Sequence, residues 1–293
     1  VQKVRRIVRQ KRVGHTGTLD PDATGLLVLT LGKATRLTRF FIQAPKTYEG
    51  TVRFGISTDT YDAAGEVVAE RPVAGLTPEG VATAMAGLEG TYDQTPPPYC
   101  AKKINGVKYY ELARRGEEVP LEPKEVTVYG FEPIGDLAAS LAAVTPPRGS
   151  TIAFRLSCTS GTYARSLAHE LGERLAVGAH LASLRRLRVG GFRVDDAVPV
   201  QELARRLEAG EPVEPAWIPF DRVPLPFAEA VTDLQQERRL VHGQTVLMRD
   251  LGGEEGDWVK LLNSRHELIA VGTVVERIGG GKVGVVQPKI VFA

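Results

Sequence analysis

The sequence has few cysteines and no long hydrophobic run. Cys100 and Cys158 are its two cysteines, too few for a disulfide framework and typical of a reducing compartment. Its apolar stretches, such as GLLVLTLG and LAASLAAV, are far shorter than the ~18 residues of a membrane-spanning helix. No signal-peptide pattern is visible. We therefore expect a cytoplasmic protein with no membrane partner.

Sequence motifs for metals and nucleotide cofactors are also missing. The five histidines do not follow the spacing of a zinc motif, and neither a phosphate-binding P-loop nor a GxGxxG after a strand is present. The five histidines are His15, His169, His180, His242 and His266. The sequence thus predicts no metal site and no cofactor.

Length and composition indicate a globular protein of two domains. The chain has 293 residues, 43% of them hydrophobic and 25% charged, as in ordinary folded domains. Five prolines between residues 212 and 226 predict a linker. We expect a large domain over residues 1–211 and a small all-β domain over residues 227–293, with strands at 257–262, 267–276 and 282–292.

Hydrophobic periodicity predicts strands and helices in the large domain. Residues 48–56 alternate, with Tyr48, Val52, Phe54 and Ile56 on one face, and residues 151–158 alternate as well. Helices are expected around 77–89, over 200–210, and after residue 160, where apolar residues recur every four positions up to Leu175. Gly178 is the expected C-terminal stop of that helix. This pattern is compatible with an α+β fold but does not define a topology.

Positive charge is concentrated in three clusters, although the net charge is only +2. Residues 1–40 hold nine Lys/Arg against two acidic residues, and further clusters lie at 101–115 and 184–193, both with aromatic residues among the cations. One such run is usually a solvated face. Three of them predict a groove for a polyanion such as RNA, because neutralising phosphates supplies most non-specific affinity.

The stretch GHTGTLDPDATG, residues 14–25, holds a candidate catalytic carboxylate. Asp20 precedes a proline, which places it in a turn. An ordinary Asx turn is one interpretation. The other is that the rigid turn presents Asp20 while the nearby glycines let a substrate approach, so that the carboxylate acts as nucleophile or base.

Three other side chains have both a structural and a functional interpretation. Arg165 lies early in a helix, where a cation is mildly unfavourable unless a carboxylate partners it. It could equally be an exposed arginine. Tyr48 shares its face with core residues, and the pattern alone favours a core aromatic. His15, next to a glycine, could simply be a turn residue.

Four segments together resemble the bacterial tRNA pseudouridine-55 synthase family, of the TruB type. They are KRVGHTGTLDPDATGLLVLTLGKATRL, KTYEGTVRFGISTDTYDAAGEV, PPPYCAKKINGVKYYELARRG and CTSGTYARSLAHELGERLAVGAHLASLRRLRVGGF. The resemblance covers residues 1–192, and the C-terminal module is similar to the small PUA-like RNA-binding domain of that family. It implies an α+β fold with a mixed, largely antiparallel sheet, flanking helices and a central active cleft.

The resemblance also implies an activity. The enzyme would flip a uridine out of the T-loop of tRNA and isomerise it to pseudouridine, without cofactor or guide RNA. The N1–C1′ bond breaks and a C5–C1′ bond forms, so the reaction has no redox change. Flipping the base costs a few kcal/mol, which aromatic stacking and phosphate contacts offset. The expected partner is the T-arm of tRNA, and we expect a monomer that requires no protein partner.

Site residues follow from the resemblance position by position. Asp20 would be the catalytic aspartate, Arg165 its cationic partner, and Tyr48 the aromatic side chain that stacks on the uracil and helps move its C5 proton. His15 would fill space near the flipped base, and Leu184 would form an apolar wall of the pocket. The second basic cluster adds substrate-binding candidates, which are Lys102, Lys103, Lys108 and Tyr110.

The sequence departs from the family pattern in two respects. The family usually begins with a strand and a KPxGxTS segment before the basic helix, and this sequence starts inside that helix. Cys100 stands where serine is usual, and Ser160 stands where lysine is common. Neither substitution changes Asp20, Tyr48 or Arg165.

Three alternatives stay open at this point. HTGTLDP superficially resembles the loop of aspartyl-phosphate enzymes, and dependence on Mg²⁺ would identify phosphoryl transfer. A non-catalytic RNA-folding protein would have the same basic surfaces, and would keep its effect when Asp20 is replaced. A dyskerin-type synthase would need a guide RNA.

Overall fold

The computed structural model describes residues 1–99, 103–104, 107–108, 122–143 and 149–292. The chain divides into two compact units, each discontinuous in sequence. The central unit comprises His15–Val28 and Phe41–Ala197, and the terminal unit comprises Val1–Gly14, Leu29–Phe40 and Val198–Ala293. The linear domain boundaries expected above, with a linker at 212–226, stay a prediction.

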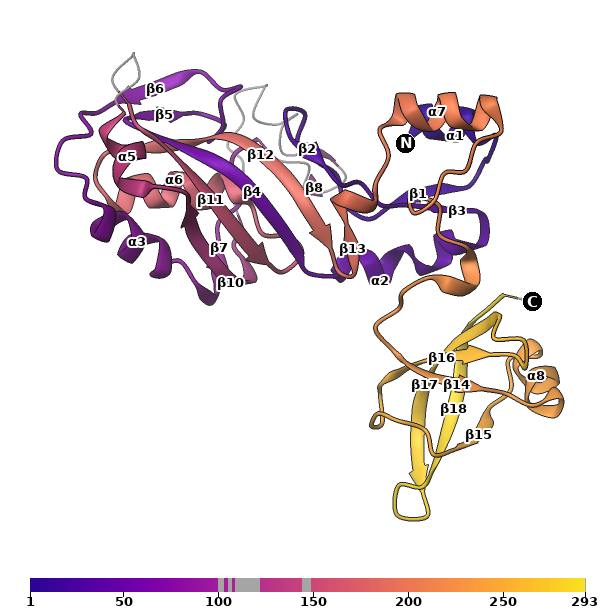
Figure 1. Cartoon of the computed structure of the whole chain (residues 1–293). Helices are drawn as coiled ribbons and strands as arrows, with labels where there is room; N and C mark the ends of the chain where they lie inside the picture. Colours follow the sequence, from indigo (N-terminus) through magenta and orange to yellow (C-terminus); the bar gives the residue numbers. More distant parts are fainter. Residues whose placement is uncertain (100–102, 105–106, 109–121, 144–148, 293) are drawn as a thin grey trace. The chain divides into compact units, whose positions relative to one another are not determined.

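One seven-stranded sheet forms the framework of the central unit (Figure 1). Its order is β13-β12-β4-β11-β10-β7, and β2 pairs with β12 outside this path. The neighbouring strands are antiparallel except for the β2–β12 pair, so the sheet is mixed and largely antiparallel, as predicted. Its strands are β2 (Thr24–Gly25), β4 (Lys46–Phe54), β7 (Gly90–Gln94), β10 (Lys124–Ile134), β11 (Thr151–Cys158), β12 (Ala179–Val189) and β13 (Phe192–Arg193).

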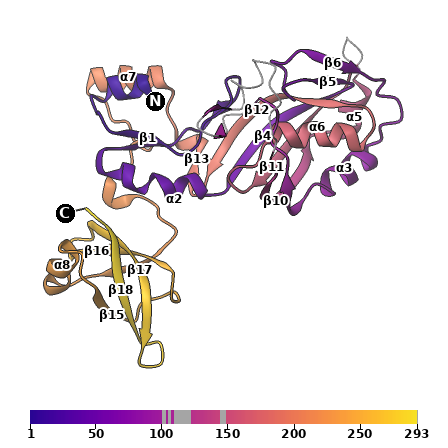
Figure 2. The same ribbon diagram turned by 180° about the vertical axis from the view of Figure 1, so that it is seen from behind.

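Helices α3 (Pro78–Ala86) and α6 (Ala164–Arg174) cover one face of this sheet (Figure 2). Alternation explains the packing, because Ile152, Phe154 and Leu156 of β11 point to the helices and are almost completely buried. The strand predicted at 151–158 is therefore confirmed. Other elements of the unit are β5 (Ile56–Thr58), β6 (Val67–Glu70), β8 (Lys103–Ile104), β9 (Val107–Lys108), α5 (Leu137–Ala142) and η2 (Val194–Asp196).

Two predicted element boundaries are corrected by the backbone. The strand expected over 48–56 is divided, because Gly55 has φ +91° and Ile56 begins the separate strand β5. The helix after residue 160 ends at Arg174 rather than at Gly178. Ala176 already has φ +58°, and the amides of Val177 and Gly178 both donate to the carbonyl of Gly172, so the chain leaves the helix earlier.

The terminal unit contains a five-stranded sheet of order β14-β16-β17-β18-β15. Its strands are β14 (Ala228–Val231), β15 (Val246–Arg249), β16 (Trp258–Leu262), β17 (Leu268–Ile278) and β18 (Val283–Val291). The three strands expected in the C-terminal module are confirmed, but the module also holds helix α8 (Leu234–Val241), which starts with a capping box between Asp233 and Gln236. The remaining elements of the described residues are α1 (Gln2–Ile7), β1 (Val13–His15), β3 (Leu29–Leu31), η1 (Gly32–Leu37), α2 (Thr38–Gln43), α7 (Val200–Ala209) and η3 (Phe220–Arg222), of which β1 and α2 belong partly to each unit.

Part of the N-terminal positive charge lies against aromatic rings of the terminal unit. Arg39 sits 4.8 Å from the ring centres of Phe40 and Trp258, and Lys33 sits 4.3 Å from that of Phe220. Such cation–π contacts hold the cations in place without neutralising them. Among the described residues, no helix is long and apolar enough to span a bilayer.

Candidate active site

Arg165 is the centre of a polar cluster in the central unit. It lies in the first turn of α6, and its side chain is only 8% exposed. Its Nε lies 3.0 Å from Oδ2 of Asp20, and its Nη2 donates to Oδ1 of the same carboxylate at 3.4 Å. Its Nη1 lies 3.2 Å from Oδ2 of Asp62. Two carboxylates therefore resolve the conflict between a cation and a helix N-terminus that the sequence raised.

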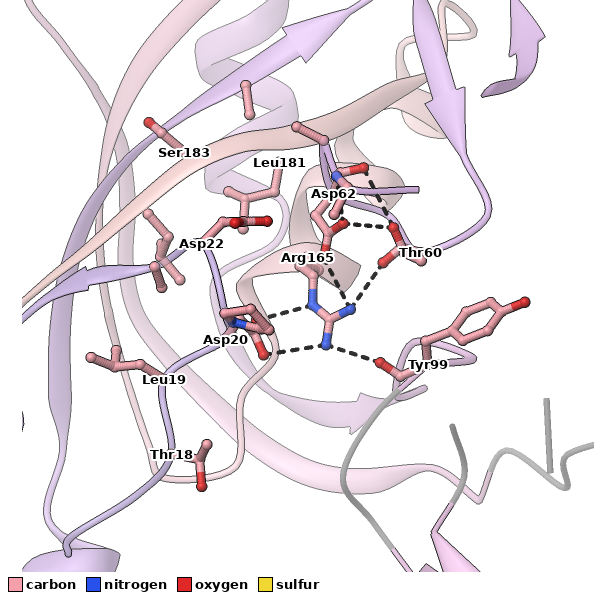
Figure 3. Close-up of a pocket in the computed structure, with 16 residues that line it drawn as sticks. Thr18, Leu19, Asp20, Asp22, Thr60, Asp62, Tyr99, Arg165, Leu181 and Ser183 are labelled. Atoms are coloured by element: carbon pink, nitrogen blue, oxygen red, sulfur yellow. Dashed lines mark hydrogen bonds and ion pairs between the residues drawn. The ribbon is translucent and has the colours of Figure 1, made fainter. Parts of the chain in front are cut away.

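Backbone carbonyls complete the surroundings of this guanidinium (Figure 3). Nη1 donates to the carbonyl of Thr60 at 3.1 Å, and Nη2 donates to the carbonyl of Tyr99 at 3.1 Å. The planar fork of arginine suits this arrangement because its donors point in fixed directions. Loops from three parts of the chain are thus tied to one side chain.

The loop that carries Asp20 is held by a second arginine, Arg186 of β12. Arg186 is 1% exposed, and its Nε and Nη2 donate to the carbonyls of Leu26 and Gly17 at 2.8 and 3.1 Å. Its own carbonyl accepts from the amide of Leu26 at 2.8 Å. Both ends of the turn around Asp20 are therefore fixed to the sheet.

Gly25 allows this loop to approach the sheet closely. It pairs with Arg186 in the parallel β2–β12 ladder and has φ +95°. A Cβ atom at this position would lie 2.3 Å from the carbonyl oxygen of Arg186, so a side chain is excluded both by conformation and by space. The close packing of this loop against β12 therefore requires glycine at position 25, the last residue of GHTGTLDPDATG.

Asp62 occupies a tight loop between β5 and β6. Its Oδ1 accepts from the hydroxyl of Thr60 at 2.6 Å and from the amide of Ala64 at 3.1 Å, which leaves Oδ2 for Arg165. Its backbone forms an isolated bridge with Leu181 of β12. Asp62 was not among the predicted site residues, although it lies in one of the four segments that resemble the family.

The Arg165 cluster forms one side of a pocket of about 480 Å³ (Figure 3). The Asp20 loop, the Asp62 loop and residues 181–184 of β12 contribute most of its wall. The lining residues are Thr18, Leu19, Asp20, Pro21, Asp22, Ala23, Thr60, Asp62, Ala63, Ala64, Tyr99, Arg165, Leu181, Ala182, Ser183 and Leu184. The lining combines a few charged groups with apolar side chains, which is the usual composition of a small-ligand site.

The predicted site residues are only partly brought together by the fold. Asp20, Arg165 and Leu184 line the pocket. His15 does not line it, and its Nδ1 accepts from the amide of Gly17 at 3.4 Å. Lys103 and Lys108 are backbone partners in the β8–β9 pair, whereas Lys102 and Tyr110 lie outside the described residues, as do Cys100 and most of the second basic cluster.

Tyr48 lies beside the pocket rather than in its wall. It is opposite Arg186 in the β4–β12 ladder and packs against the core. Burial is the main cause that raises the pKa of Tyr48, and the Asp20 carboxylate adds to the effect. The phenol is therefore protonated at neutral pH, and it lies within electrostatic reach of Asp20.

The arginines of the third basic cluster, residues 184–193, differ in their exposure to solvent. Arg185 and Arg188 are exposed and available to a polyanion, but Arg186 between them is buried. The basic cluster predicted at 184–193 therefore contributes Arg185 and Arg188, but not Arg186, to an exposed cationic surface. No residue pattern distinguishes Arg186 from its neighbours, since its partners are backbone carbonyls far away in the sequence.

Three aspartates line the pocket, but they do not form a metal centre. Among the described residues, no group of three or more His, Cys, Asp or Glu side chains is placed to hold a metal ion. Two of the aspartates instead share Arg165. The predicted absence of a metal site stays a prediction for the whole chain.

Replacing Arg186 by methionine is expected to destabilise the central unit by about 3 kcal/mol, because buried carbonyls lose a charged donor. Arg185→Met is the matched control, since Arg185 is exposed on the same strand. Urea unfolding of both variants measures the difference. Equal stability of the two variants would contradict the anchoring role of Arg186.

Comparisons with known proteins identify a family. Residues 5–164 match the model of the TruB family pseudouridylate synthase N-terminal domain, and residues 165–232 match the tRNA pseudouridylate synthase B C-terminal domain. The chain is 39% identical to tRNA pseudouridine synthase B of Solibacter usitatus (strain Ellin6076), over 94% of this chain and 90% of that protein. It is 38% identical to the protein of the same name from Ralstonia pickettii (strain 12J), over 98% and 87% of the two chains.

A solved structure shares the fold at lower sequence identity. The chain is similar to one in the crystal structure of the archaeal box H/ACA sRNP Nop10-Cbf5 complex, with a TM-score of 0.70 and 22% identity. The match covers 100% of this chain and 80% of that one. At this identity the likeness concerns the fold alone.

Proposed function

This chain belongs to the TruB family of pseudouridylate synthases, and from that premise we propose that it isomerises a uridine in the T-loop of tRNA, with Asp20 as the catalytic carboxylate. Membership of the family makes the chain an isomerase that converts uridine to pseudouridine. The tRNA substrate is inferred from the names of the relatives. The T-loop position and the roles of individual residues are our proposal.

The observation that carries the assignment of Asp20 is its two-point contact with Arg165 at the edge of the pocket. The guanidinium stabilises the negative charge that a nucleophile or base requires. At the same time the Asp20 side chain is 44% exposed, so a substrate can reach it. Arg165 is buried and holds the carboxylate, while Asp20 lines the pocket.

The pocket suits a flipped nucleoside. When the N1–C1′ bond breaks, the uracil must rotate and be recaptured through C5 without escaping. Leu181 and Leu184 supply an apolar wall for the base, and the charged groups lie where the ribose would be attacked. Tyr48 is proposed to stack on the uracil when RNA is bound.

The balance of the reaction requires no external reagent. One carbon–nitrogen bond breaks and one carbon–carbon bond forms, and the C5 proton moves to solvent or to the nitrogen that is released. Asp20 can attack the nucleotide or take up a proton, and either step uses only its carboxylate. We therefore propose catalysis without cofactor or guide RNA.

Release of tritium from RNA labelled as [5-³H]uridine tests this function. We expect the full chain to release tritium from a tRNA T-arm stem-loop in EDTA and without guide RNA, but not from an anticodon stem-loop labelled in the same way. Release from the anticodon stem-loop alone would overturn the T-loop proposal. Release only after adding Mg²⁺, or only with a guide RNA, would overturn the corresponding part of the mechanism. Tight binding without release under any condition would favour a non-catalytic RNA-binding protein.

A further inference from the structure

A second contact joins the Asp62 loop to α6, next to the ion pair with Arg165. Tyr61 and His169 stack face to face, with ring centroids 3.8 Å apart and an interplanar angle of 5°. Tyr61 directly precedes Asp62, and His169 follows Arg165 by four residues, about one helical turn. The aromatic stack and the Asp62–Arg165 ion pair are therefore adjacent contacts between the same loop and the same face of α6.

The backbone of Tyr61 depends on such support. Its φ of +65° lies in the left-handed region, which a bulky residue occupies only where its surroundings hold it there. Its amide donates to the carbonyl of Thr58 at 3.3 Å, and its carbonyl accepts from the amide of Leu181 at 2.9 Å. The stack holds the ring on the helix side, and the bond to Leu181 holds the backbone on the sheet side. These contacts hold the residue directly before Asp62, and the hydrogen bonds from Thr60 and Ala64 to Oδ1 orient the carboxylate itself.

The His169 ring contributes its flat face to this contact. Its Nδ1 is buried and has no hydrogen-bond partner among the described residues. Burial is the main cause that lowers the pKa of His169 below its ordinary value, so the ring is uncharged near neutral pH. A planar apolar ring of similar size would therefore replace it in the stack.

We propose that Tyr61 and His169 are positioning residues for pseudouridine formation, which act by holding Asp62 against Arg165 and thereby Arg165 against Asp20. The inference rests on the proposed function of the Asp20–Arg165 pair. It assigns a role in the rate of the chemical step, not in RNA binding, because neither ring lines the pocket.

The first test compares variants that remove or keep the stack. Tyr61→Asn deletes the ring but suits the left-handed backbone, and His169→Ala deletes the other ring. Both are expected to lower the single-turnover rate of tritium release about tenfold, since a small displacement of a catalytic group is costly, with the Kd for T-arm RNA unchanged within about twofold. His169→Phe, which keeps a flat ring, is expected to restore the rate.

The second test is a double-mutant cycle with Asp62→Asn. If the stack acts through Asp62, Tyr61→Asn lowers the rate about tenfold in the wild-type chain but less than about twofold in the Asp62→Asn background. Equal losses in both backgrounds, or no rescue by His169→Phe, would overturn the inference. Should Tyr61→Asn not fold, as seen from its Tm, the His169→Ala and His169→Phe variants enter the same cycle. An inactive wild-type chain would instead overturn the proposed function itself.

Discussion

Asp20→Asn is expected to abolish pseudouridine formation while T-arm RNA binding stays within about threefold of the wild-type level. Removing the reactive side chain of a catalytic unit typically costs at least about 10³-fold in kcat. Asparagine has nearly the same shape and can still accept a hydrogen bond from Arg165, but it can neither attack the nucleotide nor act as a base. Single-turnover tritium release and filter binding on the same protein preparation separate the two effects.

Asp22→Asn is the matched control for this substitution. Asp22 lies two residues away and lines the same pocket, yet it is more exposed, and the carboxylates that pair with Arg165 are those of Asp20 and Asp62. Its variant is expected to lose less than about tenfold in rate, since no step of the proposed chemistry uses its carboxylate. If Asp20→Asn retained more than a tenth of the wild-type rate, the catalytic assignment of Asp20 would be wrong.

Elements with strong periodicity could be predicted from the sequence alone. The alternation over 151–158 predicted strand β11, and the separation of four residues between Leu167 and Leu171 predicted helix α6. The apolar side chains of both elements are buried in the core. The order of the strands could not be predicted in this way. β12 lies beside β4, more than a hundred residues earlier in the chain, and hydrophobic periodicity carries no information about such pairing.

Candidate site residues could be proposed from the sequence where a motif carries them, and were missed where only tertiary contacts mark them. Asp20 and Arg165 follow from motifs that resemble the family, and the fold brings them together. Asp62 looks like any acidic residue in a polar loop, and Arg186 looks like part of a basic surface. Both acquire their roles from partners that lie about 100 to 170 residues away. Burial of a charged group depends on such partners and not on its sequence neighbours.

Arg165→Lys is expected to lower the single-turnover rate at least about 100-fold, although the positive charge is kept. The guanidinium contacts two carboxylates and two carbonyls at the same time. An ammonium is a point charge with three donors on a flexible stem, and it does not reproduce a planar two-point contact with Asp20. The loss in rate therefore reports the geometry of the contact with Asp20, because the charge at position 165 is unchanged.

Arg165→Met separates the two contributions further. It removes the charge as well, so the Asp20 and Asp62 carboxylates are left without a shared cation, and we expect a rate below that of Arg165→Lys and a lower free energy of unfolding. Rates are measured with enzyme in excess over labelled T-arm RNA, and unfolding is followed in urea. If Arg165→Lys kept the full rate, charge alone would suffice, and the positions of Asp62, Tyr61 and His169 around the guanidinium would have no part in catalysis. If both variants instead lost the same large factor in rate, the two-point geometry at Asp20 would be the property that the surrounding loops are built to maintain.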